Sequence, residues 1–109
     1  MSGIVAAHAW YVYIVRTHDG SLYTGVTTDV VRRLAEHHAD DGRGARYLRG
    51  RAPLEIVYRR RLRERGLALS VERRLKRRPR ADKEAIIAAR PSRRALLRWL
   101  GVSDPRQCV

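Results

Sequence analysis

Five polar side chains in this sequence are of types that can bind phosphate, hold a cation or move a proton. They are two tyrosines ten positions apart, an arginine and a histidine four positions apart, and a later glutamate: Tyr13, Tyr23, Arg33, His37 and Glu72. Each has an ordinary interpretation when taken alone. Tyrosines in strands usually pack, and the arginine and histidine would fit a solvated helix face. Their significance therefore depends on the charge and the elements around them.

The chain carries a strong positive charge. Its 109 residues include 24 Lys and Arg against 11 Asp and Glu, a formal net charge of +13. Such an excess favours a polyanionic partner, and we expect DNA, with RNA left open. Net charge reports attraction and not chemistry, so a ribosomal RNA or an acidic membrane face remains an alternative on charge alone.

The two tyrosines lie in runs that predict a β-hairpin, residues 10–16 and 21–27, joined by a short His-Asp-Gly segment. A two-residue Asp-Gly turn would place Tyr13 and Tyr23 on opposite faces of the sheet. A three-residue loop with a left-handed glycine places both on one face and brings Gly25 across from Tyr13. We expect this second register.

The spacing of apolar residues predicts the elements after the hairpin. A helix capped by Thr28 or Asp29 runs to about residue 39, and residues 40–51 form an exposed, Gly-rich loop. The helix should bury one stripe, consisting of Val31, Leu34, Ala35 and His38. A third strand over 54–60, a second helix over about 66–78 and two short helices over 82–89 and 92–100 follow, the last burying Trp99 and ending at Gly101.

These elements predict an α+β fold, a small three-stranded antiparallel sheet flanked by helices. We expect one domain over 1–109, with a core at about 9–79 and a helical tail at about 80–102. The longest apolar run is too short to cross a bilayer, and the first residues lack the features of a secretory signal. The single cysteine, Cys108, cannot form an internal disulfide. We expect a cytoplasmic protein without membrane association and favour a monomer.

The motifs resemble those of the GIY-YIG nucleases. Tyr11-Val12-Tyr13 stands where that family has its first motif, and Tyr23-Thr24-Gly25 where it has the second, at the family's ten-residue step. Residues 32–37 resemble the helix that carries the family's arginine and histidine, and residues 68–76 the helix that carries its glutamate. The resemblance spans about residues 10–78 and is closest to the small stand-alone bacterial members.

The resemblance implies a metal-dependent DNA endonuclease that hydrolyses phosphodiester bonds. It makes Tyr13 the general base, Tyr23 a hydrogen-bonding group that orients water or phosphate, and Arg33 the clamp on the scissile phosphate. His37 would relay a proton to Tyr13, and Glu72 would hold one divalent ion, Mg²⁺ or Mn²⁺. A phenol has an ordinary pKa of about 10, so nearby positive charge would have to lower it.

Basic residues near these motifs should contact the nucleic acid: Arg32, Arg73, Lys76 and Arg77. Phosphate contacts of this kind position DNA without reading its sequence. We therefore expect little base specificity and recognition of shape, in single-stranded, branched or duplex DNA, as in repair or recombination. Lys76 lies one turn after Glu72, so an ordinary helix ion pair is its alternative role.

The sequence departs from the family pattern in four ways. Tyr11, Val12 and Thr24 replace the usual glycine and isoleucines, changes that a strand can absorb. The chain also has no asparagine, a residue that many members carry near the end of the domain. A nucleic-acid-binding module with a nuclease-like fold that does not cleave, or cleaves weakly, is therefore the alternative.

Overall fold

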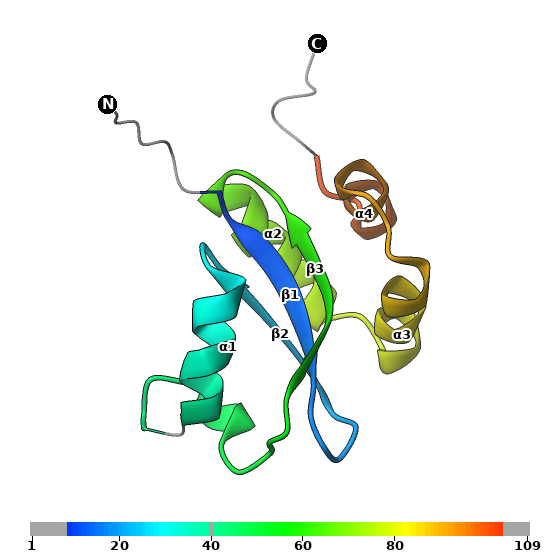
Figure 1. Ribbon diagram of the computed structural model, residues 1–109. Helices are drawn as coiled ribbons and strands as arrows, with labels where there is room; N and C mark the ends of the chain where they lie inside the picture. Colours follow the sequence, from blue (N-terminus) through cyan, green and yellow to red (C-terminus); the bar gives the residue numbers. More distant parts are fainter. Residues whose placement is uncertain (1–8, 40, 104–109) are drawn as a thin grey trace, which may run out of the picture.

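A three-stranded antiparallel sheet with strand order β2-β1-β3 forms the centre of the molecule. The computed structural model describes residues 9–39 and 41–103. In chain order, its elements are β1 (Tyr11–Arg16), β2 (Leu22–Thr27), α1 (Val30–Ala39), a 3₁₀ turn η1 (Arg46–Leu48), β3 (Glu55–Arg61), α2 (Arg65–Lys76), α3 (Arg80–Ala89) and α4 (Arg93–Leu100). The predicted fold class is confirmed, and helices lie on both sides of the sheet (Figure 1).

The hairpin has the register expected from a three-residue loop. Tyr13 pairs with Gly25 and Val15 with Tyr23, so both tyrosines lie on one face. Gly20 has a φ of 86°, the left-handed conformation that this loop requires. Because the loop has three residues rather than two, the two motif tyrosines lie on the same face of the sheet and can meet.

The sheet has an apolar layer on each face, because successive strand side chains point to opposite sides. Val12 and Ile14 face the larger layer, to which α2, α3 and α4 contribute apolar side chains. Tyr13 and Val15 face the smaller layer, which is completed by the segment between α1 and β3. The helices after residue 80 therefore pack into the main core.

The predicted buried stripe of α1 is wrong at three of its four positions: Leu34 packs against the smaller apolar layer, but Val31, Ala35 and His38 are exposed. Val30 and His37 are buried, whereas Val31 is 72% exposed and His38 is exposed. Both rows of residues have helical spacing, so periodicity alone does not separate them. The sheet determines which row is buried, because Tyr13 on β1 contacts His37 in that row. Asp29 caps this helix, with its Oδ1 accepting from the Arg32 N–H at 3.0 Å.

The last helix begins and ends as predicted but does not bury its tryptophan. Ser92 accepts from the Ala95 N–H at 3.2 Å, and Gly101 ends the helix in the left-handed conformation. The helix buries its leucines, whereas Trp99 remains 37% exposed. Over the ranges that the structure describes, every helix is too short or too polar to span a bilayer.

Candidate active site

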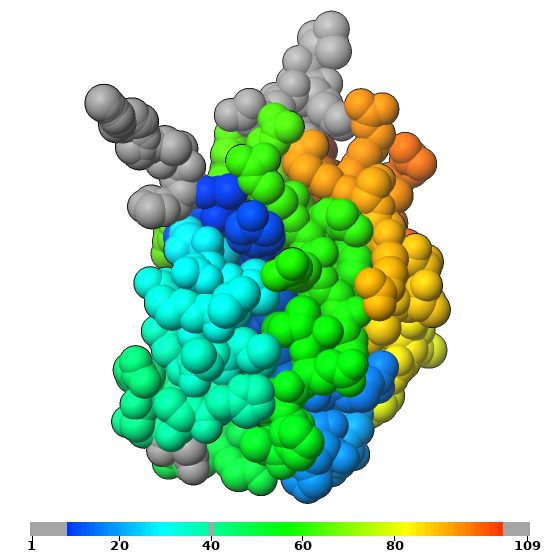
Figure 2. Space-filling model, in the orientation of Figure 1, coloured from blue at the N-terminus to red at the C-terminus, as the bar shows by residue number. Residues whose placement is uncertain are grey.

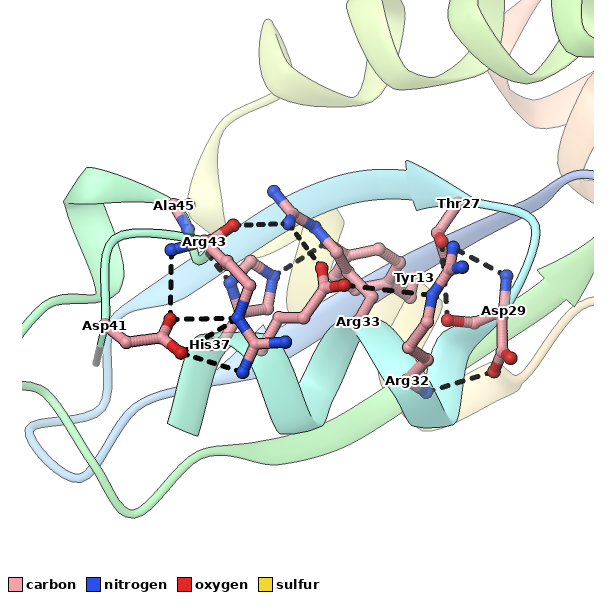
Figure 3. A network of polar contacts seen from close by, with 10 residues as sticks. Tyr13, Thr27, Asp29, Arg32, Arg33, His37, Asp41, Arg43 and Ala45 are labelled. Atoms are coloured by element: carbon pink, nitrogen blue, oxygen red, sulfur yellow. Dashed lines mark hydrogen bonds and ion pairs between the residues drawn. The ribbon is translucent and has the colours of Figure 1, made fainter. Parts of the chain in front are cut away.

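A buried hydrogen bond joins the sheet to α1 at the centre of the candidate site. The Tyr13 Oη lies 3.0 Å from the His37 Nε2, and the two residues are only 2% and 4% exposed. On the other side of the ring, the His37 Nδ1 lies 3.0 Å from the backbone nitrogen of Ala45 (Figure 3). The imidazole is therefore held at both nitrogens.

These two contacts determine where the imidazole proton is. A backbone N–H can only donate, so Nδ1 must accept from Ala45 and carries no proton. The neutral ring then has its proton on Nε2 and donates it to Tyr13. As a result, the Tyr13 oxygen accepts from His37, and the phenol's own hydrogen is directed away from the imidazole.

The protonation states of both groups follow from burial. Burial, followed by the positive charge of Arg33, lowers the pKa of His37 to about 4, so the ring is neutral at pH 7. Burial, followed by the neighbouring Tyr23, raises the pKa of Tyr13 to about 12, and the nearby Arg33 opposes this rise. Without substrate, Tyr13 is therefore a neutral phenol, a weak base placed beside two groups that would stabilise its anion.

Arg33 is fixed next to the phenol by α1 and the loop that follows. Its Nη1 donates to the Glu36 carboxylate at 2.9 Å and to the Arg43 carbonyl at 2.7 Å. Figure 3 shows this loop closing over the side chains that α1 directs toward Tyr13. Arg33 keeps 29% of its side chain exposed, which leaves part of the guanidinium able to meet a phosphate.

Tyr23 connects this pair to the surface. Its ring centroid lies 6.5 Å from that of Tyr13 and 5.9 Å from that of His37, which it meets edge-on. A third tyrosine, Tyr47 of η1, lies nearly parallel to Tyr23, at 5.9 Å and 19°. The rings form a continuous aromatic cluster from the buried hydrogen bond to solvent.

Gly25 makes room for the Tyr13 ring. β2 is an edge strand, and the Tyr13 ring crosses it directly above this residue. A Cβ at position 25 would overlap the Tyr13 hydroxyl and lie 2.6 Å from its Cζ. The glycine of the second motif is therefore required by close approach, and its φ is not in the left-handed range.

Glu72 reaches the site from α2, which packs beside β2. Its carboxylate lies 3.3 Å from the Lys76 Nζ, and that ammonium group lies 5.8 Å from the centre of the Tyr23 ring. The negative charge of Glu72 is also among the smaller causes that raise the pKa of Tyr13. The glutamate thus borders the tyrosines, and it is paired with the lysine in this structure.

The donors present fit a weakly held hard cation. The described residues contain no group of three or more His, Cys, Asp or Glu side chains that could enclose a metal. Glu72 offers a single carboxylate with 19% of its side chain exposed. Mg²⁺ commonly binds through one or two carboxylates together with water and substrate phosphates, so this site would need the nucleic acid to complete it.

The predicted nucleic-acid contacts are on the surface. Arg32, Arg73, Lys76 and Arg77 are all exposed. Arg32 also makes a long ion pair, 3.8 Å, with Glu36. Their placement on the surface leaves them able to contact phosphates.

Sequence reasoning missed the loop between α1 and β3. Its Ala45 N–H fixes the His37 ring, and Gly44 allows the loop to pass close to that helix, because a Cβ there would lie 2.7 Å from the His37 Cα. Tyr47 in the same loop extends the aromatic cluster. The available signal was an aromatic residue within a Gly- and Arg-rich segment, which had indicated only an exposed loop.

Comparisons with known proteins place the chain among small bacterial proteins. The model of the GIY-YIG catalytic domain matches residues 9–85, a range that includes all five predicted site residues. The UPF0213 protein YhbQ of Salmonella typhimurium is 42% identical over 88 residues, 81% of this chain and 86% of the relative. A UPF0213 protein of Nitratidesulfovibrio vulgaris is 48% identical over 83 residues, 76% of this chain and 74% of the relative.

A solved structure is similar as well. The solution NMR structure of a UPF0213 protein from Bacillus halodurans has a TM-score of 0.50 and 35% sequence identity, and the match covers 87% of this chain and 99% of that chain. The similarity to this structure therefore extends beyond the motifs to nearly the whole described chain.

Proposed function

This chain belongs to the GIY-YIG family, and we propose that it is a metal-dependent endonuclease that hydrolyses phosphodiester bonds in DNA. The observation that carries the proposal is the buried Tyr13–His37 hydrogen bond with Arg33 beside it. A surface that only binds nucleic acid needs positive charge, and it gains nothing from burying a phenol against an imidazole of fixed protonation.

In the proposed reaction, Tyr13 takes a proton from the attacking water. It can do so only as the phenolate, whose population rises tenfold for each pH unit up to its pKa. The His37 Nε2–H and the Arg33 charge both favour that anion, since hydrogen bonds and opposite charge stabilise the ionised form. This assigns His37 a different role from the proton relay that the resemblance implies: it positions Tyr13 and donates to it.

The other groups act on the phosphate. Arg33 contacts the phosphoryl oxygens through the exposed part of its guanidinium, and Tyr23 orients water or phosphate at the mouth of the site. A divalent ion held by Glu72 would supply positive charge to the phosphoryl and leaving oxygens. Without substrate, Glu72 is paired with Lys76.

The substrate is proposed to be recognised by shape. The exposed Arg32, Arg73, Lys76 and Arg77 form phosphate contacts, whose strength falls steeply with salt. A structure-directed nuclease with little sequence preference would fit DNA repair or recombination, a suggestion that rests on the site and the fold together.

A binding module that does not cleave is the second candidate. The Glu72–Lys76 ion pair favours it, because the lysine already offsets the charge of the carboxylate that would hold the cation. The raised pKa of Tyr13 points the same way.

Cleavage of labelled single-stranded, duplex, flap and branched DNA separates the two candidates. We expect cutting with Mg²⁺ or Mn²⁺ that chelation stops and that Glu72→Gln reduces by orders of magnitude without loss of DNA binding. Glu55→Gln, a change at an exposed glutamate of β3, is the matched control and should cut normally. Salt-sensitive binding with no cutting of any substrate would select the binding module.

A further inference from the structure

Tyr47 is an exposed aromatic residue for which the proposed chemistry has no use. It lies in η1 and is 46% exposed, and it is one of three exposed large apolar side chains among the described residues. Its ring is nearly parallel to that of Tyr23, at an angle of 19°. With 5.9 Å between centroids, the two rings are offset and overlap only in part. Nearly half of Tyr47, 46%, therefore remains exposed next to the site.

One guanidinium lies over this ring, and two further arginines are close to it in sequence. The Arg51 guanidinium lies 4.6 Å from its centre and is held there by an ion pair of 2.7 Å with Asp19. Arg46 and Arg49, its neighbours in sequence, are exposed. An aromatic ring between cations is the combination that proteins use to bind single-stranded nucleic acid, where bases stack and the backbone meets positive charge.

The Tyr47 side chain borders a shallow cleft. The cleft has a volume of about 220 Å³, and its lining consists of Ser21, Leu22, Tyr47, Arg80 and Lys83. This volume is below the roughly 300 to 1,000 Å³ of sites that enclose a small ligand. A single planar group is a better fit than a cofactor, and the two basic side chains provide contacts for a phosphate beside it.

Hydrogen bonds from two other parts of the chain hold the surroundings of Tyr47 in place. The hairpin loop holds it from one side, since the His18 ring is hydrogen bonded to the Arg51 carbonyl at 3.0 Å. Helix α3 holds the same loop from the other side, through an Arg80 Nη2 that donates to the Gly20 carbonyl at 2.7 Å. Figure 2 shows the hairpin loop lying between the segment after η1 and α3 at its lower right.

We infer that Tyr47 is a stacking platform for an unpaired nucleobase next to the phosphate that is cut, with the base taking the place that the Arg51 guanidinium holds over the ring. The proposal rests on the proposed function for the position of that phosphate. In a duplex both faces of a base are covered by its neighbours, so only an unstacked base can reach the ring. The substrate class is therefore nucleic acid that is single-stranded at the cleavage point, such as an overhang or a flap, rather than continuous duplex.

Fluorescence of 2-aminopurine tests the platform without any cleavage. Short single strands with 2-aminopurine at successive positions are titrated with the full chain in EDTA. Stacking on Tyr47 should quench one position strongly. Tyr47→Ala should abolish that quenching and weaken binding by about 5- to 150-fold, the effect of losing one base–aromatic stack. Tyr47→Phe keeps the ring and should retain both.

A matched control and the other outcomes complete the test. Trp99→Ala removes an aromatic of similar exposure from α4 and should leave the quenching unchanged. Thermal melting of each variant identifies loss of fold, and Tyr47→Phe remains informative if Tyr47→Ala is unstable. Quenching that survives in Tyr47→Ala, or an equal loss of affinity for duplex and single strand, overturns the inference. Tyr47-dependent quenching in a protein that cuts nothing would support the platform and refute the nuclease.

Discussion

Replacing Gly25 with alanine tests the arrangement of strand and tyrosine on which the site depends. The Tyr13 ring crosses β2 above this residue, and an added Cβ would lie 2.6 Å from the ring's Cζ and 3.1 Å from its Cε2. Carbon atoms in contact stay about 3.5 to 4.0 Å apart. The ring must therefore move by about 1 Å, because the Cβ is fixed to the backbone of a paired strand.

This displacement affects both activity and stability. Tyr13 is 2% exposed and bonded to His37 at 3.0 Å, so a shift of about 1 Å breaks or distorts that hydrogen bond. A misplacement of this size can lower a rate by about 10²-fold. Forcing extra volume into a packed site costs about 1–3 kcal/mol of unfolding free energy, which a folded domain of this size can tolerate.

Single-turnover cleavage and thermal melting measure the two effects of Gly25→Ala. Gly66→Ala is the matched control, because a Cβ there has no atom within 4 Å and should leave the rate unchanged. In a Tyr13→Ala background the obstructing ring is absent, so the stability cost of Gly25→Ala should fall toward zero. A Gly25→Ala protein with the wild-type rate, or a cost that is the same in both backgrounds, would refute the reasoning.

Three further changes test other contacts. The folded-state pKa of His37, about 4, is below its ordinary 6.5, so the neutral ring contributes about 3 kcal/mol of unfolding free energy above pH 6.5, which is lost as pH falls toward 4. His37→Gln should therefore reduce the fall in unfolding free energy between pH 6.5 and 4 in denaturant melts, and an equal reduction by His38→Gln would contradict its assignment to His37. Gly44→Ala should push the loop away from α1 and free the His37 Nδ1 from the Ala45 N–H. The ¹⁵N chemical shifts of His37 should then show a mixture of imidazole tautomers, and a ring that stays entirely in the Nε2–H form would argue that the loop does not fix the tautomer. Thr24→Val removes a buried hydroxyl that lacks a partner among the described residues and should stabilise the fold by about 1 kcal/mol; a lower melting temperature would show that the hydroxyl is satisfied.

Local patterns were sufficient to predict the sheet and most helix ends. The three-residue hairpin loop determined the pairing of Tyr13 with Gly25, because strand register has only two parities. Ser92 and Gly101 marked the last helix, since caps depend on one residue and its neighbours. These features are encoded within a few positions of where they act.

Features that depend on tertiary packing could not be predicted in the same way. The buried side of α1 was assigned to the row of Val31 and His38, while the sheet selects the row of His37. The roles of the Ala45 N–H and of Tyr47 depend on a loop that folds back over the helix. Neither periodicity nor composition contains that information, because a loop's path is set by contacts distant in sequence.

The catalytic role of the Tyr13 hydroxyl is tested most directly by single-turnover cleavage of flap DNA by Tyr13→Phe, with DNA binding measured in parallel. Tyr11→Phe, two positions earlier in the same strand, is the matched control. If Tyr13 is the base, Tyr13→Phe should bind DNA normally and cut at least 10²-fold more slowly, while Tyr11→Phe cuts at the wild-type rate. Cleavage by Tyr13→Phe at the wild-type rate would contradict the proposed mechanism.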